Sequence, residues 1–405
     1  MKTAAIICEY NPFHNGHRFL MEECRRILGA DTAIVCVMSG DFVQRGEAAV
    51  YLKHDRARAA VAGGADLVLE LPLPWCMAPA ETFARGAVGL LGAAGPVTHL
   101  CFGSECGDLT ALQETADTLL KPELDALIRD NMAEGTPYAA ARQAAVETLL
   151  GQPSPALNRP NDILAVEYLK ALKKQGLSLA PLTVARRGAG HDSGKADDLP
   201  SASFLREKLR AGEDIRLWVP AAALDALAQG EGMVDAAAVE TAQLSRLRFL
   251  PEEAFAAAPD VSEGLDRRIY RAARTEPTLE AAVAAASSKR YPLSRIRRIC
   301  LAAALGVRAE DSEGVPPYLR VLAANNQGAA LLREMEDAAS LPVLTKPAHV
   351  HAMGTAAERC FALGAGAADL CALGLSGAER RRGDRDWQSA PAMVKTPENA
   401  AFPAP

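Results

Sequence analysis

Two histidines near the N-terminus have the type and spacing to handle phosphate chemistry. His14 and His17 lie three residues apart in the stretch EYNPFHNGH, so both can project to one side of a helix's first turn. Gly16 between them has no Cβ, which allows a ligand to approach the backbone closely. Two imidazoles that donate to phosphate oxygens would stabilise the charge that develops on an α-phosphate as pyrophosphate leaves.

Two other interpretations of this histidine pair stay open. A His-x-x-His pair can hold a metal ion, although no acidic or cysteine residue stands nearby at the usual ligand spacing, so we assign no metal ligands. The two side chains can also be solvated groups at the start of a helix. Their position directly after the first apolar run favours the phosphate site, because helix N-termini bind anions there.

The elements around this motif predict a parallel sheet. Apolar runs at 3–8, 32–38, 66–71 and 99–102 alternate with helical spacing at 15–28, 56–62 and 82–91. Continuous apolar strands in this β-α order are typical of an α/β fold whose parallel sheet is covered on both faces. Ligands bind such sheets at the carboxyl ends of the strands, where residues 9–17 lie.

The rest of the chain divides into two parts. Residues 108–150 and 162–174 are expected to be helical, 182–185 to form a last strand, and 201–210 a helix that begins at a serine. From about 216 strand signals almost vanish and proline-punctuated helical periods dominate, with one lone strand at 341–344. We therefore expect a catalytic α/β domain at 1–215 and a mainly α-helical domain at 216–405, with a loosely ordered tail from about 376.

Composition limits the classes of protein that the chain can belong to. The 405 residues carry 44 basic and 50 acidic side chains, a net charge of −6, so any nucleic-acid binding must come from a local basic patch. No apolar stretch approaches the ~20 residues of a membrane span, and Glu9 ends the N-terminal apolar run too early for a signal peptide. Nine cysteines without a CxxC motif favour reduced thiols in a cytoplasmic protein.

One local basic patch lies between residues 289 and 298. Five basic side chains and one aromatic ring occur there with no acidic residue: Lys289, Arg290, Tyr291, Arg295, Arg297 and Arg298. Basic groups with a stacking ring suit an RNA backbone and an unstacked base, and helical spacing would leave the arginines on the exposed face. A solvated basic helix face is the alternative. Arg380, Arg381 and Arg382 form a weaker cluster in the tail.

Longer motifs in the chain resemble those of the tRNA(Met) cytidine acetate ligase family, within the HxGH nucleotidylyltransferase superfamily. They cover most of residues 1–345: EYNPFHNGH, MSGDFVQRGE at 38–47, GADLVLELP at 64–72, FGSE at 102–105, NDILAVEYLKAL at 161–172, RRGAGHD at 186–192, SASFLR at 201–206 and SSKRYPLSRIRR at 287–298. The resemblance implies a Rossmann-like fold. It also implies a reaction in which ATP activates acetate as acetyl-AMP, which then acetylates N4 of the wobble cytidine of elongator tRNA(Met).

The same resemblance implies an ATP site, with His14 and His17 as catalytic residues and Mg²⁺ accompanying the ATP. The implied ATP-binding residues are Ile7, Cys8, Glu9, Tyr10, Asn11, Pro12, Phe13, His14, Asn15, Gly16, His17, Arg18, Phe19, Leu20, Gly103, Asn161 and Arg186. Gly103 would leave room for adenine or ribose, Asn161 would bind a base edge or ribose hydroxyl, and Arg186 would pair with phosphate. Arg187 stands where the family usually has an apolar residue, so both arginines are candidates.

A serine-rich helix start resembles the second motif of the superfamily. Ser201, Ser203 and Arg206 would there contact the β- and γ-phosphates, although Ser201 can also be an ordinary helix cap. Gln44, Arg45 and Lys53 follow the second strand and are weaker candidates for the same cleft. Glu70 and Glu105 have no specific role assigned.

Two other functions stay open at the level of sequence. One is a small-molecule adenylyltransferase with the same nucleotide site, against which the basic segment at 289–298 counts. The other is a non-catalytic RNA- or nucleotide-binding protein. The expected partners are elongator tRNA(Met) and acetate, with no membrane and no stable protein partner indicated.

Overall fold

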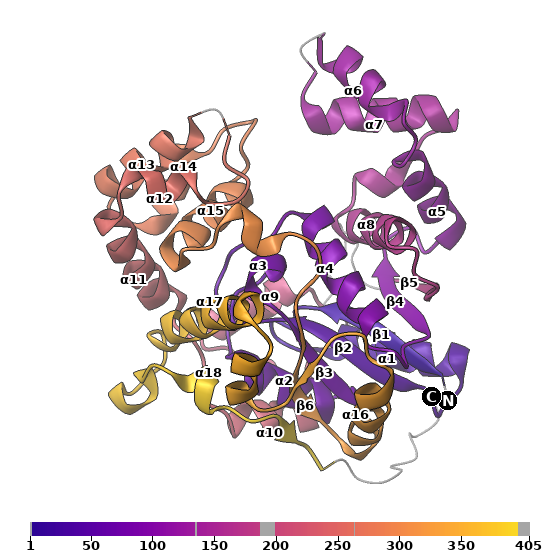
Figure 1. Cartoon of the computed structure of the whole chain (residues 1–405), viewed down its shortest axis with the longest axis vertical. Helices are drawn as coiled ribbons and strands as arrows, with labels where there is room; N and C mark the ends of the chain where they lie inside the picture. The colour runs from indigo at the N-terminus through magenta and orange to yellow at the C-terminus, as the bar shows by residue number, and fades with distance from the viewer. Residues whose placement is uncertain (1, 134–135, 187–198, 263, 396–405) are drawn as a thin grey trace.

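The computed structural model describes residues 2–133, 136–186, 199–262 and 264–395. Its centre is one twisted sheet with the strand order β5-β4-β1-β2-β3-β6-β7, and β8 pairs with β6 (Figure 1). The strands are β1 (Thr3–Cys8), β2 (Ala33–Ser39), β3 (Leu67–Leu71), β4 (His99–Ser104), β5 (Ala180–Ala185), β6 (Leu319–Ala324), β7 (Val343–Leu344) and β8 (Ala392–Met393).

The first five strands form the parallel sheet that the sequence predicts. β1 pairs in parallel with β2 and with β4, β2 with β3, and β4 with β5. The chain leaves β1 toward β2 on one side and later reaches β4 on the other, so the strand order reverses at β1. This reversal opens a crevice outside the carboxyl ends of β1 and β4, which is where doubly wound sheets bind ligands. The Rossmann-like α/β fold is confirmed.

Helices bury both faces of the sheet. Side chains alternate along the strands, so that Val35, Val37 and Leu69 join one apolar cluster while Ile34, Cys36 and Val68 join the other. On the first face lie α3 (Leu73–Cys76), α4 (Ala80–Ala93) and α8 (Pro160–Lys174). On the second lie α1 (Asn15–Leu28), α2 (Lys53–Ala62), α9 (Ala202–Arg210) and α10 (Ala221–Ala228).

Two groups of helices project from the sheet, on opposite sides in Figure 1. One comprises α5 (Leu109–Thr118), α6 (Leu124–Ala133) and α7 (Tyr138–Leu150). The other, which we call the helical lobe, comprises α11 (Ala236–Phe249), α12 (Glu252–Ala256), α13 (Leu265–Thr275), α14 (Leu279–Ala286) and α15 (Leu293–Leu305). The helices predicted after residue 216 are therefore present in this lobe.

The chain then returns to the sheet, a feature that the sequence does not predict. β6 pairs antiparallel with β3, whereas Leu, Arg and Ala in its sequence are good helix formers. The pairing edge of β3 decides the strand state here, so the expectation of almost no strand after 216 is wrong at β6. A strand is present within the segment expected at 341–344, but it covers only Val343–Leu344 and is not a lone strand, since β7 pairs with β6 in the same sheet. A boundary at residue 215 separates strands of one sheet, and the division into two domains stays a prediction.

The C-terminal segment is also ordered against the sheet. α16 (Asn326–Ala338) and α17 (Thr355–Ala372) lead into α18 (Arg385–Gln388) and β8, where Asp386 is buried. The expectation of a loosely ordered tail from about 376 is wrong for residues 376–395, and 396–405 lie outside the described residues. Within the described part of the chain, no helix has both the length and the apolar character that crossing a membrane requires.

Candidate active site

A cavity of about 490 Å³ opens at the carboxyl ends of β1 and β4. Its walls come from the β1–α1 turn, the loop after β2, the first turns of α8 and α9, and the end of β5. The residues expected at the site that line it are Ile7, Cys8, Glu9, Tyr10, Asn11, His14, His17, Leu20, Gln44, Arg45, Gly103, Asn161, Arg186, Ser203 and Arg206. The topology of the sheet thus gathers segments that are up to two hundred residues apart in the sequence.

His14 and His17 hold each other through the backbone at the start of α1. His14 is the N-cap residue, and its Nδ1 accepts a hydrogen bond from the Gly16 amide at 3.0 Å. The Nδ1 of His17 accepts from the His14 amide at 3.2 Å, and the two rings stack with centroids 3.7 Å apart. This reciprocal arrangement is a capping box made of two imidazoles. It fixes both rings on the cavity wall.

The electrostatics of the pair favour neutral imidazoles. Burial, and then the charge of Arg186, lower the pKa of His14 to about 3. Burial, His14 and Arg186 lower the pKa of His17 well below its usual value. Since both Nδ1 atoms accept hydrogen bonds, a neutral ring carries its proton on Nε2. Each histidine is therefore a fixed Nε2–H donor rather than a cation.

A buried arginine fixes the strand ends that border the cavity. The guanidinium of Arg56 is fully buried and donates to the backbone carbonyls of Glu9, Ser39 and Gly40, at the ends of β1 and β2, and to that of Tyr51. These bonds fix the strand ends from which the site is built. The sequence predicts a helix at Arg56 but no role for it, because its partners are backbone atoms that no side-chain motif reveals.

Glu9 projects into the same cavity beside several arginines. Its Oε1 accepts from the Gln44 amide at 2.9 Å. Burial raises the pKa of its carboxyl above the usual value, although the Gln44 hydrogen bond and the nearby arginines oppose that shift. Glu47 also lines the cavity, so two carboxylates face the space.

Asn161 is held in place by Glu105 at the start of α8. Its Nδ2 donates to the Oε1 of Glu105 at 2.6 Å, and the Asp162 amide donates to the other carboxylate oxygen at 2.8 Å. In return, the Oδ1 of Asp162 accepts from the Glu105 and Cys106 amides. This clamp between β4 and α8 leaves the Oδ1 of Asn161 as an acceptor for a ligand. It also supplies the role that the sequence did not give for Glu105.

Gly103 and Arg186 lie side by side at the ends of β4 and β5. A Cβ on Gly103 would come within 3.3 Å of the Arg186 side chain, so the missing Cβ makes room for the arginine as well as for a ligand. The Arg186 amide donates to the Ser104 carbonyl at 2.9 Å, which anchors the residue, while its side chain lines the cavity. Arg187 lies outside the described residues.

The start of α9 contributes a serine and an arginine. Arg206 donates to the Asn11 carbonyl at 3.1 Å and to the Ser203 hydroxyl at 3.1 Å, and both side chains line the cavity. Ser201 caps the helix by accepting from the Phe204 amide and does not line the cavity. The ordinary cap is therefore the role that the structure gives Ser201.

Some other expected residues support the site without lining this cavity. Phe13 is fully buried under the motif, and Asn15 donates to the Leu217 carbonyl. Arg18 forms an exposed ion pair with Glu22. Gly16 and Phe19 line an adjacent cavity of about 60 Å³, behind the histidines. Pro12 lines neither cavity.

Lys53 belongs to a buried ion cluster and not to the cleft. Its Nζ lies 2.8 Å from Glu70 and 2.5 Å from Asp386, and Arg320 pairs with the same two carboxylates. Burial raises the pKa of Asp386, but Lys53 and Arg320 outweigh it and hold that pKa well below its usual value. The expectation that Lys53 faces the cleft is wrong, since carboxylates from β3 and α18 hold its charge.

Three of the basic residues expected to bind RNA are paired with acids. Arg297 donates to Glu47 at 2.7 Å, while Arg295 and Arg298 pair with Asp260. Their side chains are 22%, 19% and 11% exposed for Arg295, Arg297 and Arg298, so the expected exposed arginine face is wrong for them. Lys289 and Arg290 are exposed, and Tyr291 is half-buried.

The apolar part of the cavity wall is not predicted from the sequence. It comprises Ile6, Val43, Ala80, Phe83, Phe102, Ile163, Leu164 and Tyr168. The rings of Phe102 and Tyr168 lie 6.0 Å apart, and burial raises the pKa of the Tyr168 hydroxyl. Because apolar residues in strands and helices have the same pattern whether they face a ligand or the core, periodicity could not separate them.

Comparisons with known proteins agree with this geometry. Residues 1–386 match the model of the HIGH Nucleotidyl Transferase family. A tRNA(Met) cytidine acetate ligase of Acetivibrio thermocellus is 36% identical over 85% of this chain and 88% of its own length. One of Caldanaerobacter subterraneus is 37% identical over 86% and 89%. The crystal structure of Thermotoga maritima TmcAL bound with alpha-thio ATP has a TM-score of 0.89 and 30% identity, covering 98% of this chain and 100% of the other. The chain therefore belongs to the HIGH nucleotidyl transferases and, among them, to the tRNA(Met) cytidine acetate ligase family.

Proposed function

We propose that this protein is an ATP-dependent ligase that activates acetate as acetyl-AMP and acetylates N4 of the wobble cytidine of elongator tRNA(Met). One observation carries the proposal: two neutral, stacked histidines present fixed Nε2–H donors to a cavity of about 490 Å³ at the point where the strand order reverses. The relatives named as ligases of this kind, and the relative crystallised with an ATP analogue, support it.

The first step is displacement at the α-phosphorus. A carboxylate oxygen of acetate forms a bond to phosphorus as the bond to the bridging oxygen breaks, and pyrophosphate leaves. Negative charge on the phosphate oxygens increases in the transition state, and Nε2–H donors of His14 and His17 would stabilise it. Neutral donors suit this role because their protonation does not have to change around neutral pH.

The remaining polar groups of the cavity suit the rest of ATP. Arg186, Arg206 and Ser203 would hold the phosphates by charge and hydrogen bonds. Asn161 would accept from a ribose hydroxyl or the base through its Oδ1, with Gly103 leaving space beside it. The apolar wall around Phe102 and Tyr168 would contact the adenine.

Mg²⁺ is part of the proposal as a companion of ATP. Magnesium sites of this kind use one or two carboxylates together with substrate phosphates. Glu9 and Glu47 line the cavity and would supply carboxylate oxygens of that kind, Glu47 through the oxygen that does not accept from Arg297. Bound there, the ion would neutralise phosphate charge.

The second step transfers the acetyl group directly to RNA. The N4 amine attacks the acetyl carbon, loses a proton, and AMP leaves. No protein thiol is needed as a carrier: burial raises the pKa of the Cys8 thiol, the cysteine of the cavity wall, well above its usual value. A protonated thiol is a poor nucleophile. Orientation of the two substrates would supply most of the rate.

RNA would bind to the helical lobe, and the reaction would take place in the cytoplasm. Lys289, Arg290 and Tyr291 stay candidates for tRNA contact, in a region that α15 connects to the cavity rim through Arg297 and Glu47. All nine cysteines are unpaired, as suits a reducing compartment.

A labelling experiment tests the proposal. Purified protein is incubated with [14C]acetate, ATP and an elongator tRNA(Met) transcript, and label in cytidine is measured together with AMP. We expect label in the wobble cytidine and one AMP for each acetyl group. Formation of AMP with another carboxylic acid, without label from acetate, would contradict the substrate assignment. An AMP transfer to a phosphorylated metabolite would instead support an adenylyltransferase.

A further inference from the structure

A second arginine-rich surface lies on α13, away from the basic segment that the sequence singled out. A groove of about 420 Å³ follows this helix, and Arg267, Arg268 and Arg271 line it. All three side chains are exposed. We propose that this groove binds the sugar–phosphate backbone of the tRNA substrate at nucleotides outside the wobble position. This inference rests on the proposed function for the identity of the RNA.

The spacing along α13 presents the arginines together. Arg267 and Arg271 are one helical turn apart and therefore neighbours on one face, with Arg268 beside them. The apolar residues Leu265, Ile269 and Ala273 occupy the opposite face and are buried, while the buried Ala272 lies at the base of the groove between the two faces. The apolar face of α13 packs into the core of the lobe, whereas the face with the arginines makes no contribution to that core.

The guanidinium groups of this groove are accessible to a polyanion. Arg271 has no ion-pair partner among the residues described around it. Arg267 pairs with Glu252, but those side chains are 78% and 41% exposed, and exposed ion pairs contribute little. Arg268 donates one amino group to the carbonyls of Ala285 and Ser287, which orients its remaining donors. Arg295, Arg297 and Arg298 of α15 are in contrast occupied by Asp260 and Glu47.

The positive charge of the groove and its several guanidinium groups on one exposed helix suit a chain of phosphates, as in nucleic acid. Glu276 is the carboxylate among its lining residues, against three guanidinium groups. Guanidinium groups bind phosphates bidentately, and an exposed helix with several of them makes the phosphate contacts that supply affinity for RNA. Such contacts position the RNA without reading its sequence, which suits nucleotides distant from the reacting base.

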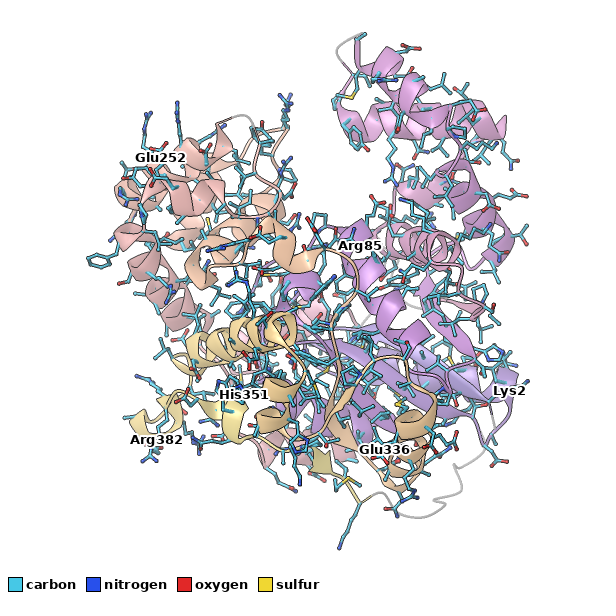
Figure 2. All side chains as sticks on the ribbon, viewed as in Figure 1. Lys2, Arg85, Glu252, Glu336, His351 and Arg382 are labelled. Carbon is cyan, nitrogen blue, oxygen red and sulfur yellow. The ribbon has the colours of Figure 1, made fainter. Side chains whose placement is uncertain are left out.

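The packing of the lobe connects this groove to the cavity. α13 packs against α11 and α14, and both of these pack against α15. α15 contacts the cavity rim, where Arg297 pairs with Glu47 and a Cβ on Gly46 would meet the backbone of Arg298. In Figure 2, Glu252, the partner of Arg267, lies at the outer part of this lobe among projecting nitrogen-tipped side chains. RNA bound in this groove would therefore lie on a lobe that packs against the rim of the reaction cavity.

Charge substitution on α13 tests the inference. The double variant Arg267→Gln/Arg271→Gln is compared with the full-length wild type and with Arg333→Gln/Lys346→Gln, a matched control with two exposed residues from α16 and the loop after β7. Binding of an elongator tRNA(Met) transcript is measured by filter retention over a series of salt concentrations. Acetate-dependent ATP–pyrophosphate exchange is measured without tRNA.

We expect tRNA binding to weaken at least about tenfold in the α13 variant, and the slope of log K against log salt to become shallower by about 2. The control should bind as the wild type does. Exchange activity should be unchanged in both, because neither pair of residues lines the cavity. The change in slope separates a phosphate contact from a general loss of structure.

Unchanged tRNA affinity and salt slope in the α13 variant would overturn the inference, whatever the activity. Loss of affinity with an unchanged slope would also overturn it, since that pattern indicates damage to the lobe. If the wild type shows no acetate-dependent exchange, the proposed function fails, while a salt-dependent loss of tRNA binding would still support an RNA site on α13. If the α13 variant bound tRNA as the wild type does but lost binding to an anionic vesicle or an acidic peptide, the groove would belong to another partner and the inference would be overturned.

Discussion

The histidine pair of α1 and the arginines of α15 are both short clusters that the sequence singles out, yet the structure treats them differently. His14 and His17 take their partners from the same helix turn, within three residues. Arg297 takes its partner from Glu47, 250 residues away. A cluster whose contacts are local keeps in the fold the arrangement that its spacing predicts. A cluster whose contacts are distant can lose it to a neighbour that spacing does not reveal.

The largest expected effect comes from Asp386, whose partners are all distant in sequence. Asp386→Asn would leave Lys53 and Arg320 without one of their two shared carboxylates, in a fully buried position. We expect the free energy of unfolding to fall by about 3–5 kcal/mol, since breaking a buried pair leaves uncompensated charge. Urea unfolding measures it. Asp384→Asn, an exposed position two residues earlier, should stay within about 0.5 kcal/mol. Equal stability of the two variants would mean that the ion pairs of Asp386 contribute nothing to the stability of the fold.

The next effect separates capping from chemistry in the histidine pair. His14→Asn keeps a side chain that can cap α1 but removes the Nε2–H donor. We expect acetate-dependent exchange to fall about 10²–10³-fold, the usual loss for one transition-state donor, with stability changed by less than about 1 kcal/mol. His17→Gln should lose a similar factor. Full activity in His14→Asn would show that the residue acts only as a helix cap.

Acid should act on the same two histidines through stability. Their folded pKa values lie below the unfolded value, so the unfolded chain binds more protons when the pH falls below about 6.5. Each histidine should then lower the free energy of unfolding by about 1 kcal/mol between pH 6 and pH 5. The stability difference between wild type and His14→Asn should be constant from pH 7.5 to 8.5 and shift toward the variant by about 2 kcal/mol at pH 5, because the loss already begins near pH 7. A constant difference throughout would mean that His14 titrates normally in the fold.

The smallest expected effect concerns the paired arginine of α15. Arg297→Gln should change tRNA affinity less than about threefold, because its guanidinium is occupied by Glu47 and only 19% of the side chain is exposed. Filter retention over the same series of salt concentrations as for the α13 variant makes the comparison direct. If Arg297→Gln weakens binding as strongly as Arg267→Gln/Arg271→Gln, α15 contacts phosphate as its sequence predicts.

Sequence alone determined the parts of this protein that depend on neighbours in the chain. Apolar runs and helical spacing fixed five parallel strands and their order of alternation, because burial on both faces leaves a continuous apolar pattern. The motif at 9–17 predicted a helix start that brings a glycine and two imidazoles into one turn, and the structure has that turn; the phosphate site is proposed on this arrangement. Longer motifs added the family.

Tertiary structure alone decided where distant side chains meet. β6 is a strand because the edge of β3 was open to pair with it, although its residues favour a helix. Lys53 and the arginines of α15 are occupied because carboxylates from other elements reach them, whereas no carboxylate of the described part of the chain pairs with the exposed Arg271. The physical reason is common to all of these cases. An ion pair or strand pairing between different elements, from 17 residues apart for Lys53 and Glu70 to 333 for Lys53 and Asp386, leaves no periodic trace in either element.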